Sequence, residues 1–321
     1  MLGYIAGLLI GFTILLFAAD RFVMGTAAIA RNLGISPLII GLTIVGFGTS
    51  APEMLISGIA AIEGNSGLAV GNAIGSNIAN IGLILGCTAI ISPITVHSQT
   101  LKRELPILLF TTIACYSLVL FGGLNRLDGI IMLIGLFIFL YWLVKTALSS
   151  RISDPLNKEI EQEIPSNIST NNAIILSLLG LAGLLASSKL LVWCAVNIAQ
   201  LFGISDLFIG LTIVALGTSL PELAASIVAI LKKEDDLAIG NVLGSNMYNL
   251  LAVLSLPGII APGPIDSVVL IRDFPWMIGF TSALFILGYN YKKNGYINRF
   301  EGLFLLAGYI GYQTLIFQSS V

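Results

Sequence analysis

Two glutamates lie inside long apolar stretches of this chain, where a charged side chain is unexpected. Glu53 ends the segment GLTIVGFGTSAPE, and Glu222 ends the closely similar segment GLTIVALGTSLPE. No lysine or arginine occurs within either segment to neutralise the two carboxylates. An ionised glutamate at bilayer depth costs at least ~2.5 kcal/mol, so such a residue usually has a partner or a function. We therefore expect Glu53 and Glu222 to act together on a positively charged ion.

Hydroxyl groups precede each glutamate by three and four residues, so within a helix they share its face. The four residues are Thr49, Ser50, Thr218 and Ser219. A proline directly before each glutamate, Pro52 or Pro221, lacks the N–H that would bond to the carbonyl four residues earlier. Unpaired carbonyls at membrane depth are tolerated only where they line a cavity or find other partners. The pattern therefore predicts a broken helix at both prolines.

A second duplicated motif supplies further oxygen atoms. Residues 71–77 read GNAIGSN, and residues 240–246 read GNVLGSN, at the same offset as the first motif. Two polar pairs with helical spacing follow from this motif: Ser76 with Asn80, and Ser245 with Asn249. Glycines in the motif would let these helices approach the broken ones closely.

The predicted ligands are all oxygen atoms, from carboxylates, hydroxyls, amides and carbonyls. Hard cations such as Ca²⁺ and Na⁺ prefer such ligands, and Mn²⁺ also accepts them, whereas zinc and copper favour nitrogen and sulfur. Two facing carboxylates repel, so with nothing bound at least one would take a proton. One Ca²⁺ would neutralise both, as would two Na⁺ or two protons. Competition for the same two charges is what an antiporter requires.

Composition fixes the class of protein. The 321 residues are 56% hydrophobic and only 10% charged, against about 25% charged in soluble domains. A polytopic membrane protein is the class that fits, with the lipid bilayer as its surroundings. No basic patch suggests a nucleic-acid partner, and no obligate protein partner is indicated. The chain has no metalloprotease motif, no nucleotide-binding loop and no paired cysteines, so we expect neither an enzyme nor a cofactor.

A helix needs roughly 20 apolar residues to cross a bilayer. Ten such segments are predicted, at 3–32, 38–62, 67–91, 104–122, 127–148, 173–200, 207–231, 236–259, 274–291 and 300–318. The stretch 149–172 is polar and acidic and is predicted to be a cytoplasmic linker. We therefore expect an all-α membrane protein with ten transmembrane helices: one five-helix repeat at 1–148, and a second at 173–321.

The distribution of basic residues predicts the orientation. If the N-terminus lies outside, 11 lysines and arginines fall in inward-facing loops and two in outward-facing loops, as the positive-inside rule requires. Both termini should then lie outside the cell (inner) membrane. Because five is odd, the second repeat enters the membrane from the opposite side. Inverted repeats are typical of secondary transporters, whose substrate site lies at mid-membrane between the repeats.

Three further charged residues fall within predicted spans. Asp20 and Lys189 occupy equivalent positions in the two repeats, and Arg21 follows Asp20. We expect these residues to form an internal ion pair, or to extend toward the membrane surface, rather than to take part in transport.

At the duplicated motifs the chain resembles the cation/calcium antiporter superfamily, specifically the prokaryotic sodium/calcium exchangers, over essentially its whole length. The resemblance implies a central calcium site flanked by sodium sites, with Glu53 and Glu222 shared by the competing ions. It assigns to the central site the carbonyls of Gly46 and Ala215 together with Thr49 and Thr218. It assigns to the outer sodium sites Ser50 with Ser76 and Ser219 with Ser245, and it places Asn80 and Asn249 as bridges near the centre.

One residue departs from the family pattern. Well-known members carry an aspartate where this chain has Asn249. The predicted site then holds two carboxylates instead of three, and has less charge with which to stabilise three monovalent ions. Exchange of Ca²⁺, or of another divalent cation, for H⁺ therefore stays open beside exchange for Na⁺. A cation channel is the further alternative.

Overall fold

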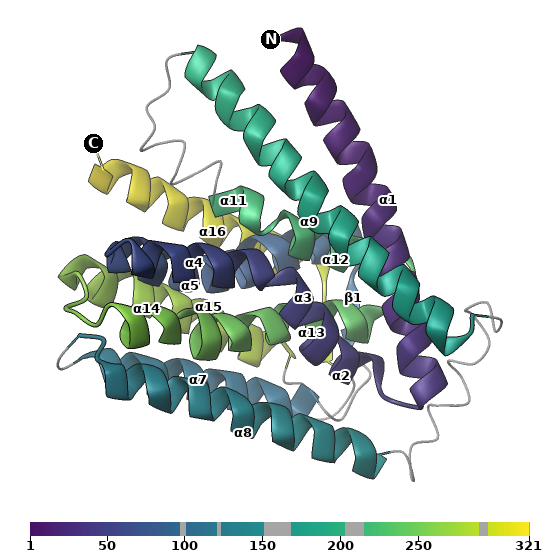
Figure 1. The fold of residues 1–321 in the computed structure, drawn as a ribbon. Coiled ribbons are helices and arrows are strands. Elements are labelled where there is room, and N and C mark those ends of the chain that lie inside the picture. Colours follow the sequence, from purple (N-terminus) through teal and green to yellow (C-terminus); the bar gives the residue numbers. More distant parts are fainter. Residues whose placement is uncertain (97–100, 121–122, 151–167, 203–214, 289–294, 321) are drawn as a thin grey trace.

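The computed structural model describes residues 1–96, 101–120, 123–150, 168–202, 215–288 and 295–320, and this part of the chain is almost entirely helical (Figure 1). Within it, eight helices are long and apolar enough to cross a membrane, and a bent pair spanning residues 37–62 makes a ninth. Large apolar side chains such as Leu9, Phe110 and Phe137 are exposed on the outside of the bundle, as contact with lipid requires. The predicted all-helical polytopic membrane fold is confirmed.

The first half of the described chain contains α1 (Leu2–Leu33), α2 (Pro37–Ile40), the π-helical η1 (Gly41–Val45), α3 (Gly46–Thr49), α4 (Ala51–Ile62), α5 (Ser66–Ala79), the π-helical η2 (Asn80–Leu85), α6 (Gly86–Ile91), β1 (Ile94–Val96), α7 (Leu101–Leu120) and α8 (Arg126–Ser150). The second half contains α9 (Thr170–Leu201), α11 (Ala215–Thr218), α12 (Leu220–Leu231), α13 (Asp235–Tyr248), the π-helical η6 (Asn249–Val253), α14 (Ser255–Ile260), the π-helical η7 (Val269–Asp273), α15 (Phe274–Gly288), β2 (Gly295–Ile297) and α16 (Arg299–Ser320).

The duplication is visible in the helix boundaries. Shifted by the repeat offset, the bounds of α3, α4, α5 and α6 coincide with those of α11, α12, α13 and α14. The same local sequence thus produces the same breaks in both halves. The predicted seventh span, 207–231, begins among residues outside the described ranges, and α11 and α12 make up its described part. Most of the predicted linker, residues 151–167, also lies outside the described ranges.

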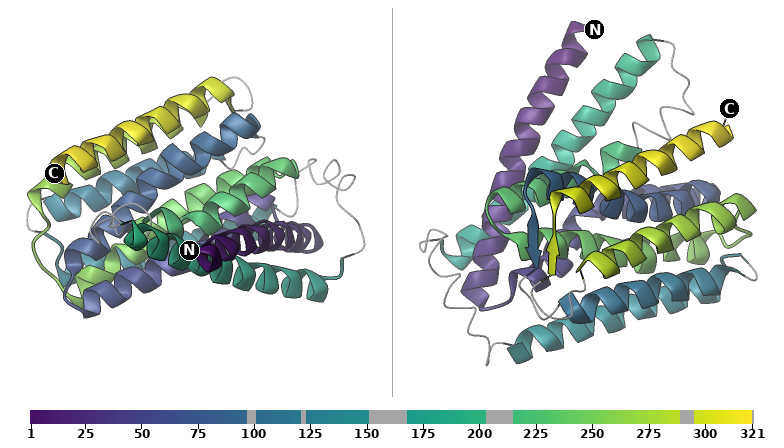
Figure 2. Two further views of the ribbon diagram at one scale, coloured as in Figure 1. Left: turned by 90° about the horizontal axis from the view of Figure 1, so that it is seen from above. Right: turned by 180° about the vertical axis from the view of Figure 1, so that it is seen from behind.

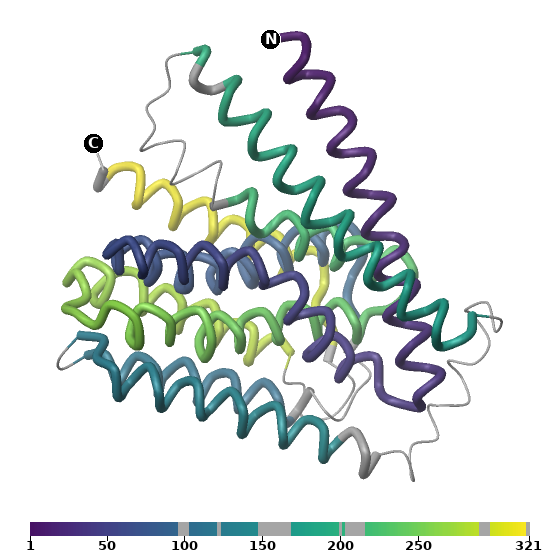
Figure 3. Tube along the Cα trace, in the orientation of Figure 1, coloured from purple at the N-terminus to yellow at the C-terminus, as the bar shows by residue number. Residues whose placement is uncertain are grey.

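Two long helices, α1 and α9, lie side by side and cross the remaining helices at a slant (Figures 1 and 2). Their contact is close because it uses glycine: a Cβ added at Gly180 would lie 2.5 Å from the backbone nitrogen of Phe22. The other helices form a second body, in which α13 and α14 make the most deeply buried span. The tube in Figure 3 shows this span running through the middle of the molecule, with α7 and α8 as an outer layer.

A short antiparallel sheet joins two loops that the sequence did not predict to pair. Strands β1 and β2 align Ile94 with Ile297 and Val96 with Gly295. The pairing ties the chain after α6 to the chain before α16, and so fixes the two repeats to each other at one end of the bundle.

The charged residues of the long helices behave partly as predicted. Asp20 forms an ion pair with Lys232, at the end of α12, with 2.6 Å between Oδ1 and Nζ. Nε of Arg21 lies 4.0 Å from Oδ2 of Asp20, and the guanidinium of Arg21 lies over the ring of Phe17. Lys189 is exposed and forms no ion pair with any described residue, so the predicted pairing holds for Asp20 but not for its repeat equivalent.

Candidate functional site

Both glutamates lie just after a helix break. Ser50 leaves helical geometry (φ −81°, ψ 4°) between α3 and α4, and the helical stretches Pro37–Thr49 and Ala51–Ile62 meet there at a bend of 44°. Ser219 (φ −87°, ψ 3°) makes the same break before α12. Each proline then occupies the first turn of the new helix, where its missing N–H removes no hydrogen bond. Glu53 and Glu222 therefore lie at helix N-termini, where the helix dipole favours negative charge.

The two glutamates are buried at the same junction, although they come from different repeats. Each is only 1% exposed, and a hydroxyl from each motif lies beside the glutamate of the other. The hydroxyl of Ser50 donates a long hydrogen bond of 3.5 Å to Oε1 of Glu222, and the hydroxyl of Thr218 reaches the carboxylate of Glu53 in return. Each glutamate is thus contacted by the motif of the opposite repeat.

Thr49 links the two halves in a second way. Its hydroxyl lies 3.0 Å from the carbonyl of Val45, in its own segment. The same hydroxyl lies 3.0 Å from Oδ1 of Asn241 and 3.4 Å from the hydroxyl of Ser245, both in α13. The buried Thr49 therefore brings the broken segment of the first repeat against the second motif of the other.

The two predicted asparagines begin the π-helical segments. Asn80 is the first residue of η2 and Asn249 the first of η6, and each is 1% exposed. Wider helical turns of this kind are frequent at functional sites. The amide of Asn80 donates to Oδ1 of Asn246, across the repeat boundary, at 3.0 Å. The sequence singled out the asparagines but gave no indication of the altered helix.

A pair of asparagines that the sequence analysis did not single out holds the glutamate backbone. The Nδ2 group of Asn72 donates to the carbonyl of Glu53 at 3.1 Å and to the hydroxyl of Ser57 at 2.9 Å. Asn241 does the same for the carbonyl of Glu222 at 3.2 Å and for Ser226 at 2.9 Å. Both asparagines follow the first glycine of the duplicated GNxxGSN motif, so the repeat itself could have identified them.

Five buried oxygen atoms around this junction have no hydrogen-bond partner among the described residues. They are Oε2 of Glu53, Oε2 of Glu222, the hydroxyl of Ser219, and Oδ1 of Asn80 and Asn249. Buried polar atoms are rarely left without a partner, because their desolvation is costly. Carboxylate, amide and hydroxyl oxygens suit Ca²⁺ and Na⁺, so the residues present fit a hard cation.

The backbone carbonyls near the breaks have several partners. The carbonyl of Gly46 accepts the N–H of Ser50 at 3.1 Å, and the hydroxyl of Thr49 lies 3.5 Å from it. The carbonyl of Gly217, freed by Pro221, accepts the hydroxyl of Ser188 in α9 at 2.6 Å. Ala215, the other predicted carbonyl ligand, is the first residue of α11.

A cavity of about 240 Å³ borders the site. Ser76 and Thr218 lie among its lining residues, together with Gly67 and Leu68 at the start of α5. Arg272, Asp273 and residues of α16 also line it. Two of the predicted ion ligands therefore border this cavity.

The predicted close approach of the second motif is observed on one side. A Cβ added at Gly240 would lie 2.5 Å from the carbonyl oxygen of Leu38, and one at Gly244 would lie 2.7 Å from that of Leu42. Their repeat equivalents, Gly71 and Gly75, line the cavity. The segment equivalent to 38–42, residues 207–211, lies outside the described ranges.

Comparison with known proteins gives one consistent family. The family profile described as "Sodium/calcium exchanger protein" matches residues 3–145 and 172–318. CaxA of Alkalimonas amylolytica is 51% identical over 97% of this chain and 98% of its own length, and the sodium/calcium exchanger MaX1 of Methanosarcina acetivorans is 30% identical over 97% of each chain. A solved structure of the sodium-calcium exchanger NCX_Mj superposes with a TM-score of 0.84 at 34% identity, over 97% of this chain and 98% of that one.

Proposed function

Because the chain belongs to the sodium/calcium exchanger family and is a membrane antiporter of that family, we propose that it exchanges Ca²⁺ for Na⁺ by alternating access. Glu53 and Glu222 are the charges for which the two cations compete. The observation that carries this proposal is the junction of two buried carboxylates from opposite repeats, surrounded by buried oxygens without partners.

The charge balance explains why the ions exchange. Two ionised carboxylates carry a charge of −2, which one Ca²⁺ or two Na⁺ cancel, and neither duplicated segment contains a lysine or arginine. Holding both kinds of ion at once would leave excess positive charge in a buried site, which is costly. Binding one kind therefore displaces the other. Among the described residues, no three acidic, histidine or cysteine side chains are placed so that together they could hold a metal ion.

We assign the ligands as follows. Calcium is held by Glu53 and Glu222 together with Thr49, Thr218 and the carbonyls of Gly46 and Ala215. Sodium is also held at two outer sites, one formed by Ser50 with Ser76 and the other by Ser219 with Ser245. Asn80 and Asn249 act as bridges near the centre. The contacts from each repeat to the glutamate of the other support this arrangement.

Alternating access follows from the duplication. We propose five spans in each repeat, at 1–148 and 173–321, inserted in opposite directions, with both termini outside the cell membrane. The matching helix bounds of α3 to α6 and α11 to α14 support two interconvertible arrangements, in which the two halves exchange roles. The cavity beside α5 is then the access route in the present arrangement.

The test is Ca²⁺ flux in reconstituted vesicles with an imposed Na⁺ gradient. We expect flux to follow the gradient in the wild-type protein and to be abolished by Glu53→Gln and by Glu222→Gln. Glu63→Gln, in the exposed residue just after α4, is the matched control and should transport normally. Normal flux in both site variants would refute the ligand assignment.

Exchange for H⁺ is the second candidate, and Asn249 is the observation that favours it. With two carboxylates in place of three, two protons suffice to replace one Ca²⁺. Flux driven by a pH gradient without Na⁺ would identify this alternative. Asn249→Asp adds a charge, so it should change the coupling ratio or the pH dependence; an unchanged ratio and pH profile would exclude residue 249 from the ion ligands.

A further inference from the structure

We propose that the ion pair of Arg272 and Asp273 sets the electrostatic potential of the route by which cations reach the site, with Asp273 cancelling the repulsion that Arg272 would otherwise exert. The inference rests on the proposed function, because it concerns access to the same site. Under this proposal, Arg272 and Asp273 influence how strongly the protein takes up the ion, although neither residue is a ligand of the ion bound by the glutamates.

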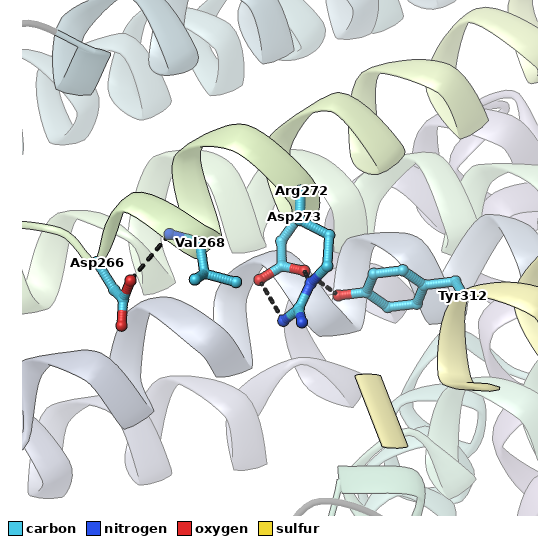
Figure 4. Close-up of polar contacts among 5 residues, drawn as sticks. All are labelled: Asp266, Val268, Arg272, Asp273 and Tyr312. Carbon is cyan, nitrogen blue, oxygen red and sulfur yellow. Dashed lines mark hydrogen bonds and ion pairs between the residues drawn. The ribbon is translucent and has the colours of Figure 1, made fainter. Parts of the chain in front are cut away.

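The pair lines the cavity that also contains Ser76 and Thr218. Figure 4 shows Arg272 and Asp273 at the end of η7, facing Tyr312 of α16. The guanidinium of Arg272 donates from Nε to Oδ1 of Asp273 at 2.7 Å and from Nη2 to Oδ2 at 3.2 Å. The hydroxyl of Tyr312 donates to Oδ1 at 3.1 Å. Three donors thus fix the carboxylate against the arginine.

An arginine on a cation route needs compensation. Its guanidinium stays protonated at all physiological pH values, and a cleft with low-dielectric walls focuses the potential of the charges that line it. The side chains of Arg272 and Asp273 are only 25% and 10% exposed, so solvent screens them incompletely. Bidentate pairing with a carboxylate is the strongest compensation that a protein side chain offers to arginine.

The duplication offers an internal comparison. Arg103 and Glu104 occupy the equivalent positions in the first repeat. Glu104 is 2% exposed, neither of its carboxylate oxygens has a hydrogen-bond partner in the described part of the chain, and it does not line the cavity. The assembled, doubly hydrogen-bonded pair is therefore found at the helix start that lines the cavity, and not at its equivalent in the first repeat.

The inference predicts an effect that scales with ionic charge. In Asp273→Asn the uncompensated Arg272 repels every cation, and the energy of an ion in a given potential is proportional to its charge. We expect the KM for Ca²⁺ at this face to rise about tenfold and the KM for Na⁺ to rise about threefold, with the maximal rate unchanged. Both effects should shrink as ionic strength rises, because salt screens the charge. Arg272→Gln should shift both constants in the opposite direction.

Two variants separate charge from structure. Tyr312→Phe removes a hydrogen bond to Asp273 without altering charge, and should leave both constants near wild type. Asp266→Asn removes an acidic side chain that is exposed on the same segment, where it accepts the N–H of Val268 (Figure 4), but that does not line the cavity. This variant should also behave as wild type.

The experiment measures Ca²⁺ and Na⁺ dependence of flux in oriented vesicles, with each ion presented in turn at the cavity face. Absence of cation-coupled Ca²⁺ flux in the wild-type protein would contradict the proposed function. Wild-type flux together with unchanged constants in Asp273→Asn would overturn this inference alone. Equal fold-changes for the two ions, or a loss confined to the maximal rate, would also overturn it, since both indicate a structural role.

Discussion

At the residue scale, the two glutamates could be found in the sequence because carboxylates without basic neighbours stand out in apolar segments. The groups that hold them in position could not be found so readily. Asn72 and Asn241 are ordinary members of a motif, and their bonds to the carbonyls of Glu53 and Glu222 depend on how α5 packs on α4 and how α13 packs on α12. Such contacts become visible only when the helices are placed together.

Asn241→Ala should weaken the site without removing a ligand. The substitution breaks three hydrogen bonds, each worth about 1 kcal/mol: those to the carbonyl of Glu222 and to Ser226, and the one that Oδ1 accepts from Thr49. We expect stability to fall by about 3 kcal/mol, and the half-saturating Ca²⁺ concentration in flux assays to rise by about tenfold. Asn197→Ala, in an exposed asparagine of α9 that bonds only within its own helix, is the control. An unchanged Ca²⁺ dependence in Asn241→Ala would show that this bond does not position the glutamate.

At the element scale, the helix breaks at Pro52 and Pro221 were predicted because proline removes a backbone donor, whatever its surroundings. The π-helical turns at Asn80 and Asn249 and the pairing of β1 with β2 were not predicted. An extra residue in a helical turn leaves no trace in hydrophobic periodicity over so few residues, and a three-residue pairing across 200 residues of sequence depends on the whole bundle.

The glycines of the second motif give a prediction at this scale. Gly240→Ala introduces a Cβ 2.5 Å from the carbonyl oxygen of Leu38, a backbone atom that cannot rotate away. We expect a loss of about 1–3 kcal/mol, as for other overpacked contacts, measured by thermal unfolding in detergent. Gly311→Ala in α16, where an added Cβ meets no described atom within 4 Å, is the control and should be close to wild type. Equal destabilisation of both variants would show that the approach of Gly240 to Leu38 does not cause the loss.

At the scale of the whole molecule, α1 and α9 form one body and the remaining helices form another. The charged contact that α1 makes with the second body has no counterpart at the equivalent residues of α9. α1 packs along α12, and its Asp20 bonds to Lys232 at 2.6 Å. The repeat equivalents of these residues are Lys189 and Glu63, with the charges exchanged. Both are exposed, and neither forms an ion pair within the described residues.

The Asp20–Lys232 pair should therefore favour the present arrangement over its alternative. A partly exposed pair contributes up to about 1 kcal/mol, so Lys232→Gln should shift the populations up to about fivefold. Distances between spin labels on α1 and α12 would measure the shift. The double variant Asp20→Lys with Lys232→Asp re-forms an ion pair with the charges exchanged, and should restore the wild-type populations. Identical distance distributions in wild type and Lys232→Gln would show that the pair does not bias the arrangement.

The central claim is that Glu53 and Glu222 hold the same ion, and a double-mutant cycle on Ca²⁺ binding tests it most directly. Calorimetric titration of the purified protein should give one Ca²⁺ per chain, displaced by Na⁺ or H⁺. If both carboxylates bind one ion, Glu53→Gln and Glu222→Gln should each weaken binding by at least about 100-fold, and the double variant should lose much less than the sum. Wild-type binding in either single variant, or losses that simply add, would contradict a shared site.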